Sequence, residues 1–512
     1  MAPNLIAQYL IGIDLGTQSI RALLADARGR TVACAARPTP AIVIADGQAE
    51  YDPEALWRCV VEDLRELAAQ VPPGGEVAGI ACASMGEACV LVDAAGAPLG
   101  HAITWFDRRT EKQAAAFEQA IGAERLFEIT GLPADPTLTL PKLLWHRDHQ
   151  PDLFARARTV LNLAHWIAFR LSGVAACDES LASRTLCLAI AARAWSGEVM
   201  AAAGLDLSLL PPLRAAGTCL GPVLDTVLAQ TGLPGRPVVG LGGHDHVCGG
   251  FAAGAGRPGV LLDSMGTAEA LYMTVAGPVV TPANRQQGFW QGLVRLHRPF
   301  AYVGAGINSS GGTVEWFRSL LGDAARDSLI AEAAAVPPGS HGALFLPHLA
   351  YATQPNVDLA SRGAFAGLTT GTTRGALFRA VLEGLAFEAR QCLDAMAALD
   401  GAGTPAEIRV IGGGTRNKLF LRIKASIYGR ALSVIGEPEA TALGAALLGG
   451  LAAGLWADLD AALAAIDQPI ETVEPDPAWA AHYAALYQQA YRPFYPALAP
   501  VSHALTRLDS PN

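Results

Sequence analysis

The sequence predicts an α/β protein built from two similar lobes with an active-site cleft between them. A buried strand, an Asp, a Gly-Thr turn and a second strand occur at residues 10–24 and again at residues 260–275. The two aspartates, Asp14 and Asp263, lie 249 positions apart, close to half of the 512 residues. Such spacing indicates two homologous lobes and not a short-period solenoid. With 51% apolar and 16% charged residues, the chain can bury large cores.

Composition excludes several classes of partner. The net charge is −10 and no sustained basic stripe is present, which argues against nucleic acid or an anionic membrane surface. A small molecule is therefore the expected partner. The nine cysteines are scattered and form no C-x-x-C pair, so we expect a reducing cytoplasm and no disulfide framework. A homodimer is compatible with this composition, although no residue pattern specifies one.

Two segments of the chain could be mistaken for a signal peptide or a membrane span. The first 14 residues lack a basic segment and run directly into a strand, so a signal peptide is not expected. Residues 440–457 carry no charge over 18 positions, but they are mostly Ala and Gly and have acidic flanks. This composition favours a close-packed internal helix over a membrane span.

The first lobe follows an α/β pattern. Asp52 and Pro53 begin an amphipathic helix that extends to about residue 71, and short strands are predicted at 77–82 and 89–92. The segment 101–109, HAITWFDRR, places an aromatic wall and polar groups at a strand exit, where they could bind hydroxyl groups or form a solvated turn. Residues 152–237 are predicted to be helical and show no catalytic constellation.

Three sites carry chemistry in this pattern. A Gly-Thr hairpin offers backbone N–H groups and a hydroxyl to phosphate oxygens, and two facing hairpins could grip a triphosphate. Asp14 beside phosphates implies Mg²⁺, because a carboxylate would otherwise repel them. Asp245 follows an apolar strand and two glycines, which makes it a candidate general base. Its neighbours His244 and His246 lack an evident third metal ligand, so we expect them to orient Asp245 or to be structural.

Glycines near residues 304–312 invite comparison with a dinucleotide-binding fold. Their spacing is not G-x-G-x-x-G, and no acidic residue ends a second strand about 20 positions further on. A Rossmann dehydrogenase is therefore disfavoured.

The doubled hairpin, the segment GGHDH at 242–246 and the segment GGGTRN at 412–417 resemble the FGGY carbohydrate kinases. That family has two actin-like, ribonuclease H-like lobes. The resemblance implies a first lobe at 1–247, a second lobe at 248–490 and a tail at 491–512. The motif at 84–87 reads Ser-Met-Gly-Glu, which departs from both the Gln-Met-His-Gly of xylulokinases and the Arg-Glu of glycerol kinases. The substrate therefore stays open among small sugars and polyols.

The resemblance also implies roles for individual residues. Asp245 would be the catalytic base and Asp14 the ligand of Mg²⁺. The residues implied to contact ATP or its phosphates are Asp14, Gly16, Thr17, Gln18, Arg21, Gly266, Thr267, Gly311, Gly312, Gly413, Gly414 and Asn417. The residues implied to contact the sugar or polyol are Met85, Glu87, Trp105, Asp107 and Asp245.

Three functions compete at this stage. The favoured one is ATP-dependent phosphorylation of a hydroxyl of a small sugar or polyol, with a pentulose such as xylulose first and other ketoses, alditols and glycerol behind. The second is an ATPase-driven binding protein with the same fold. The third is a non-catalytic sugar-binding protein, which would not need two phosphate hairpins. ATP hydrolysis stimulated by a sugar would separate them.

Overall fold

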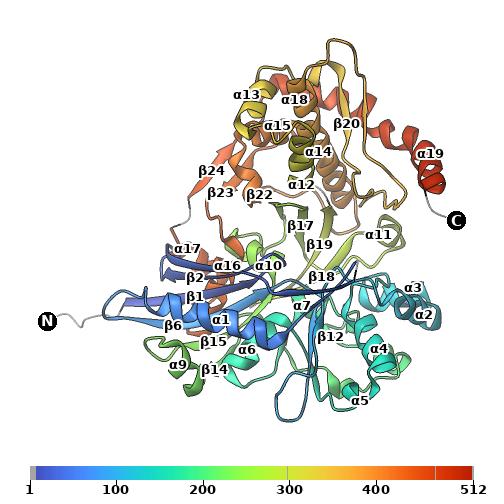
Figure 1. Ribbon diagram of the computed structural model, residues 1–512. Coiled ribbons are helices and arrows are strands. Elements are labelled where there is room, and N and C mark those ends of the chain that lie inside the picture. Colours follow the sequence, from blue (N-terminus) through green and yellow to red (C-terminus); the bar gives the residue numbers. More distant parts are fainter. Residues whose placement is uncertain (1–6, 46, 297, 309, 468, 510–512) are drawn as a thin grey trace.

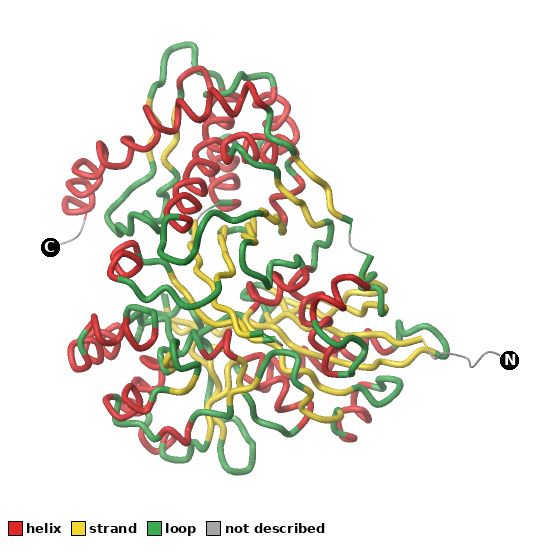
Figure 2. Tube along the Cα trace, turned by 180° about the vertical axis from the view of Figure 1, so that it is seen from behind, coloured by secondary structure: helices red, strands yellow, loops and turns green. Residues whose placement is uncertain are grey.

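The computed structural model describes residues 7–45, 47–296, 298–308, 310–467 and 469–509. Figure 1 shows two lobes stacked one above the other, each with a β-sheet and flanking helices. Viewed from behind, the strands of both sheets run through the middle of the molecule and helices cover them (Figure 2).

The first sheet forms the core of the N-terminal lobe. Its strand order is β14–β15–β6–β1–β2–β3. The strands are β1 (Ala7–Leu15), β2 (Ser19–Asp26), β3 (Thr31–Pro38), β6 (Gly75–Ser84), β14 (Cys219–Pro222) and β15 (Val238–His244). β1 and β2 form the first hairpin, while β6 and β15 run parallel to β1. Leu15 pairs with Ser84 and Ser84 with His244, so the three parallel strands end at one edge of the sheet.

The second sheet repeats this plan. Its order is β18–β19–β17–β16–β22–β23–β24. The strands are β16 (Val260–Met265), β17 (Glu269–Val275), β18 (Trp290–Arg295), β19 (Pro299–Ile307), β22 (Glu407–Ile411), β23 (Leu432–Ile435) and β24 (Ile470–Val473). β16 and β17 form the second hairpin, and β22 runs parallel to β16 with Ser264 paired to Ile411. The hairpin turn and the glycine loop after β22 therefore meet at one edge of this sheet.

Both lobes also contain short strands outside the two main sheets. They are β4 (Ala41–Ala45), β5 (Gln48–Tyr51), β7 (Cys89–Val92), β8 (Ala102–Ile103), β9 (Thr159–Asn162), β10 (Cys177–Asp178), β11 (Leu188–Ala189), β12 (Ala194–Trp195), β13 (Leu213–Arg214), β20 (Leu344–Leu346) and β21 (Ala364–Ala366).

Helices up to residue 231 belong to the N-terminal lobe. They are α1 (Pro53–Ala68), α2 (Glu111–Ile121), α3 (Ala123–Thr130), α4 (Thr139–His149), α5 (Pro151–Phe154), α6 (Leu163–Ser172), α7 (Glu179–Ala182), α8 (Gly197–Ala202) and α9 (Asp225–Thr231). The amphipathic pattern after Asp52 is confirmed, because the Asp52 side chain accepts a hydrogen bond from the Glu54 N–H and caps α1.

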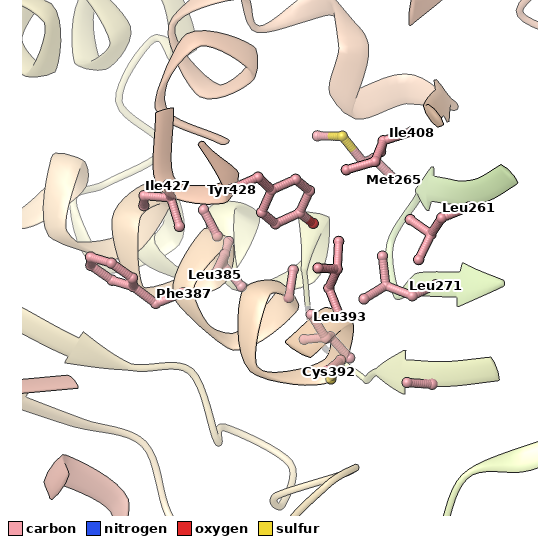
Figure 3. Packing of buried hydrophobic residues seen from close by; sticks show 14 of the residues in the cluster. Leu261, Met265, Leu271, Leu385, Phe387, Cys392, Leu393, Ile408, Ile427 and Tyr428 are labelled. Atoms are coloured by element: carbon pink, nitrogen blue, oxygen red, sulfur yellow. The ribbon is translucent and has the colours of Figure 1, made fainter. Parts of the chain in front are cut away.

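The later helices cover the second sheet or lie between the sheets. They are α10 (Asp245–Ala252), α11 (Pro282–Gln287), α12 (Gly311–Leu320), α13 (Arg326–Ala334), α14 (Arg374–Ala397), α15 (Lys418–Tyr428), α16 (Ala440–Ala452), α17 (Leu459–Ala465), α18 (Pro477–Leu486) and α19 (Arg492–Asp509). Figure 3 shows the core of the C-terminal lobe, where α14 and α15 pack onto β16, β17 and β22 through residues such as Leu385, Ile427 and Leu261.

Two helices join the lobes. α10 and α16 share one core with both sheets, in which Leu443 and Val247 pack with Ala81 of the first sheet and Leu262 of the second. Although α16 follows the second sheet in sequence, it lies against β1, β6 and β15 of the first. The Ala- and Gly-rich segment is therefore an internal helix, as predicted. No helix in the described part of the chain is long and apolar enough to cross a membrane.

The predicted tail has a defined structure. Residues 492–509 form α19, which runs along the outside of the C-terminal lobe (Figure 1). Asp358 anchors this helix by accepting hydrogen bonds from Tyr495 at 2.9 Å and from His503 at 2.7 Å. The predicted lobe boundary after residue 247 falls inside α10.

Candidate active site

Three acidic side chains meet at the carboxyl edge of the N-terminal sheet. Asp14 lies at the end of β1, Glu87 follows β6 and Asp245 follows β15. Ligands of open α/β sheets characteristically bind at the carboxyl ends of parallel strands. These residues were predicted from separate motifs, and the strand register brings them to one place.

Asp14 carries an unsatisfied carboxylate. Its Oδ1 atom is buried and has no hydrogen-bond partner among the described residues. Burial, together with the charges of Asp245 and Glu439, raises the pKa of Asp14 to about 8, and the nearby Arg21 offsets only part of this effect. A bound cation would satisfy such a group, since nearby positive charge stabilises the ionised form.

The donor set around Asp14 fits Mg²⁺. Mg²⁺ is usually held by one or two carboxylates, with waters and substrate phosphates completing its octahedron. Within the described ranges, no group of three or more His, Cys, Asp or Glu side chains is arranged to hold a metal without such help. His244 and His246 accordingly do not form a metal site with a third side chain of the described chain.

The second hairpin differs from the first in charge. Asp263 is fully buried, and its Oδ2 atom lies 2.6 Å from Lys424 Nζ and accepts a hydrogen bond from the Tyr428 hydroxyl at 3.0 Å. Lys424 also forms an ion pair with Glu269 at 2.6 Å. Asp263 is thus neutralised inside the lobe, while Asp14 faces other carboxylates. The turn of the second hairpin, at Gly266 and Thr267, lines a cavity.

That cavity, of about 640 Å³, gathers the predicted nucleotide residues of the C-terminal lobe. It is lined by Gly266, Thr267, Gly311, Gly312, Gly413, Gly414 and Asn417, with apolar walls from Val314, Ile330 and Phe420. Its volume lies in the range of small-molecule sites, about 300–1,000 Å³. Backbone N–H groups of Gly311 and Gly312 donate to the carbonyls of Gly266 and Thr267, which fixes the two loops together. Asn417 caps α15 by accepting from the Phe420 N–H.

A second cavity connects this region to the first hairpin. It has a volume of about 870 Å³, and its lining includes Arg21 from β2 and Gly413 and Arg416 from the loop after β22. Gly413 and Arg416 also line the nucleotide cavity. Arg21, predicted to contact phosphate, donates to Glu439 at 2.9 Å.

The first hairpin also touches the predicted sugar-binding segment. The Gly16 N–H donates to the Ser19 carbonyl and closes a tight turn. Within that turn, Thr17 Oγ1 accepts a hydrogen bond from Trp105 Nε1 at 2.8 Å. Trp105 is 40% exposed and is therefore accessible to a ligand. Gln18 is exposed beside it.

Two residues predicted to contact the sugar have other neighbours. Met85 is buried in the N-terminal core. Asp107 is fully buried, and its carboxylate accepts hydrogen bonds from the Ala49 N–H at 2.9 Å and from the Arg109 guanidinium. Their side chains therefore have structural partners. Glu87 is also buried and accepts a hydrogen bond from Arg184, whereas Trp105 is exposed.

Asp245 is the first residue of α10. Its Oδ1 atom accepts from the His246 N–H at 2.6 Å and lies 3.4 Å from His244 Nε2. Burial lowers the pKa of His244, which keeps its ring neutral near pH 7. The two histidines thus contact Asp245, and the neutral ring of His244 places no positive charge beside it. Its side chain is 25% exposed and accessible to a substrate.

Comparison with known proteins identifies the family. Residues 9–252 match the N-terminal domain, and residues 262–453 the C-terminal domain, of the FGGY family of carbohydrate kinases. The chain belongs to this family. The FGGY assignment confirms the expected resemblance and the two-lobed actin-like, ribonuclease H-like fold.

Individual FGGY kinases are similar along nearly the whole chain. A glycerol kinase of Gloeobacter violaceus is 33% identical over 495 residues, which cover 95% of this chain and 96% of the relative. A xylulose kinase of Bacillus subtilis is 28% identical over 459 residues, covering 88% and 90%. The crystal structure of a xyloylose kinase from Brucella ovis superposes with a TM-score of 0.88 at 28% identity, covering 96% of this chain and all of that one (100%).

Two residues of the site in this FGGY kinase could not be predicted from the sequence. Glu439 approaches Arg21 from 418 positions away, and Arg184 donates to Glu87 from 97 positions away. Arg184 lies in the stretch 152–237, which shows no catalytic pattern. His165 and Asp178 of that stretch form a buried pair at 3.1 Å. No local signal marks Arg184, because its partner is distant in sequence.

Proposed function

We propose that this FGGY kinase transfers the γ-phosphoryl group of ATP to a hydroxyl of a small sugar or polyol, with a pentulose such as xylulose as the first choice. The observation that supports the proposal is the set of residues at the edges of the two sheets. Asp14, Glu87 and Asp245 occupy one edge, and glycine loops around a cavity of about 640 Å³ occupy the other. The names of the relatives, glycerol kinase and xylulose kinase, support the same substrate class.

In this proposal Asp245 is the general base. The acceptor hydroxyl would donate its proton to the carboxylate of Asp245 as its oxygen attacks phosphorus. The His246 N–H donates a hydrogen bond to Asp245 Oδ1, and His244 Nε2 lies 3.4 Å from the same oxygen. Within the described residues, Asp245 Oδ2 has no hydrogen bond. One carboxylate oxygen is thus fixed while the other can accept the proton.

The remaining residues of the site would bind and orient the nucleotide and the sugar. Gly266, Thr267, Gly413 and Gly414 would hold the nucleotide in the C-terminal lobe, and the turn at Gly16 and Thr17, with Gln18 and Arg21, would approach the phosphates from the N-terminal lobe. Mg²⁺ held by Asp14 would offset the negative charge of the phosphates. Glu87 and Trp105 would fix the sugar, and approach of the lobes would exclude water.

A substrate screen tests the proposal. Purified protein with ATP and Mg²⁺ is offered xylulose, ribulose, xylitol, ribitol and glycerol, and ADP release is followed by a coupled assay. We expect release that depends on one of these acceptors and stops with EDTA. Acceptor-independent ADP release would favour the ATPase-driven binding protein, and the absence of ADP release would favour a sugar-binding protein.

A further inference from the structure

Arg184 and Glu87 form a nearly buried ion pair next to the proposed base. Arg184 Nε donates to Glu87 Oε1 at 2.6 Å, and the two side chains are only 16% and 9% exposed. A Cβ atom placed on Gly86 would contact the Arg184 side chain at 3.3 Å and the His244 ring at 3.2 Å. Gly86 therefore separates the ion pair from the histidine that precedes Asp245.

One nitrogen of the Arg184 guanidinium, the buried Nη1 atom, has no hydrogen-bond partner among the described residues. The group lies over the ring of Trp290, 5.9 Å from its centroid. Trp290 begins β18, which lies where the two lobes meet (Figure 1). Buried polar groups are almost always paired, so an unpaired charged donor beside the proposed reaction centre is a candidate to bind a ligand atom.

The pair is held rigidly enough to select a ligand. Glu87 has a left-handed backbone with φ of 64°, which is uncommon for a residue with a side chain. Its carbonyl accepts hydrogen bonds from Thr139 Oγ1 at 3.1 Å and from Lys142 Nζ at 3.3 Å. These contacts fix the main chain while Arg184 fixes the carboxylate.

The hydrogen-bonding groups of Arg184 and Glu87 match a particular pair of substrate oxygens. An arginine only donates hydrogen bonds, and an ionised glutamate only accepts them. A carbonyl next to a hydroxyl matches both, because the carbonyl accepts from Arg184 and the hydroxyl donates to Glu87. An alditol has a second hydroxyl in place of the carbonyl, and the proton of that hydroxyl would need another acceptor in a largely buried site.

We propose that Arg184 is a specificity-determining residue whose free Nη1 donates to the carbonyl oxygen of an open-chain ketose, while Glu87 accepts from the neighbouring hydroxyl. The inference rests on the proposed kinase function and narrows its substrate class from sugars and polyols to ketoses. Arg184 binds substrate in this account and takes no part in proton transfer.

The test compares a ketose with its alditol. We measure kcat and KM for xylulose and xylitol in the wild-type enzyme and in Arg184→Lys and Arg184→Met. Lysine keeps a cation next to Glu87 but lacks the second arm of the guanidinium fork. For Arg184→Lys we expect kcat/KM for xylulose to fall about 10- to 100-fold, mainly through KM, while the value for xylitol changes less than about threefold. Arg184→Met also releases Glu87 and should lower both values, the value for xylulose more.

The control and the melting temperature separate this role from a structural one. Arg125→Met removes another arginine bonded to glutamate, Glu198, but on the protein surface, and it should leave both substrates unaffected. Equal losses for xylulose and xylitol, or a lowered Tm with an unchanged ketose-to-alditol ratio, would overturn the proposal. If the wild-type enzyme phosphorylates sugars without preferring the ketose, the inference fails and the kinase function stands. If no acceptor stimulates ADP release in the wild-type enzyme, both fail.

Discussion

The two hairpin aspartates differ in their position in the strand and in their neighbours. Asp14 lies one residue before the end of β1 and Asp263 two residues before the end of β16, so their side chains point to opposite faces of the two hairpins. Lys424 lies 2.6 Å from Asp263, whereas the groups around Asp14 include Asp245 and Glu439. The repulsive setting of Asp14 suits a cation-binding role, and the neutralised setting of Asp263 suits a structural one.

Replacing Asp245 tests the proposed base. Asp245→Asn keeps the size of the side chain and its bond to the His246 N–H, but it cannot take up the hydroxyl proton. We expect kcat with the best acceptor to fall by roughly 10² to 10⁴. The Tm and ADP affinity should stay near wild type. A kcat within about tenfold of wild type would show that Asp245 is not the base.

Lys142 provides a prediction about pH and stability. Burial lowers the pKa of Lys142 to about 8 in the folded protein, below its ordinary value of 10.5. Between these values the unfolded chain binds one more proton than the folded chain, so this group makes stability rise with pH. Relative to Lys142→Met, the wild-type protein should gain up to about 3 kcal/mol of unfolding free energy from pH 8 to pH 10.5, because one pKa unit corresponds to about 1.4 kcal/mol.

Urea unfolding of both proteins across this pH range measures the difference. Lys112→Met, which removes an exposed lysine from α2, is the matched control and should follow the wild-type curve. Parallel curves for the wild-type protein and Lys142→Met would mean that folding does not lower the pKa of Lys142.

At the level of elements, the site depends on how closely α16 packs. A Cβ atom on Gly444 would overlap the Cys248 carbonyl of α10, and one on Gly12 would overlap the Ala442 carbonyl of α16. Glycine at these positions allows the backbones to touch, as in other close helix contacts. Because Asp245 begins α10, this contact also fixes the proposed base.

Gly444→Ala tests that contact. The added methyl group should push α10 and α16 apart and lower the unfolding free energy by about 1–3 kcal/mol. It should also lower kcat, since Asp245 moves with α10. Gly277→Ala, at a position where a Cβ atom meets nothing within 4 Å, is the control. A fully stable and active Gly444→Ala variant would disprove the tight contact.

At the level of the whole molecule, each lobe contacts residues that come from the other half of the chain. The first sheet lies in residues 7–244, but α16, at residues 440–452, covers it. The N-terminal lobe therefore receives part of its core from the C-terminal part of the chain. At the other side of the joint, the Leu293 N–H of β18 donates to Ser183 of the N-terminal lobe at 2.8 Å.

Splitting the chain between residues 256 and 257 tests this dependence. Fragment 1–256 alone should lose its cooperative unfolding transition and bind a hydrophobic dye, because the face covered by α16 becomes exposed. Co-expression with fragment 257–512 should restore a folded complex. The same second fragment with Gly449→Val should restore much less, since Gly449 approaches the backbone of Gly79 and Ile80. A cooperative transition of fragment 1–256 alone would refute the prediction.

Much of the fold is readable from local sequence. The strand–Asp–Gly-Thr–strand repeat predicts two lobes, Asp52 and Pro53 predict the start of α1, and the glycines at 412–414 predict the turn into α15. Each signal works because a cap, a turn or a hydrophobic period acts within a few residues. The positions of Asp14, Glu87 and Asp245 at strand ends could be predicted for the same reason.

Other properties come only from the tertiary structure. The sequence does not say that Met85 and Asp107 are buried, that α16 lies against the first sheet, that Lys424 neutralises Asp263, or that Arg184 reaches Glu87. Burial and charge pairing depend on groups brought together from far along the chain, and Ala- and Gly-rich helices carry little information about their partners. Local hydrogen bonds and periodicity therefore determine the elements of this kinase, and long-range packing decides which carboxylates stay free for chemistry.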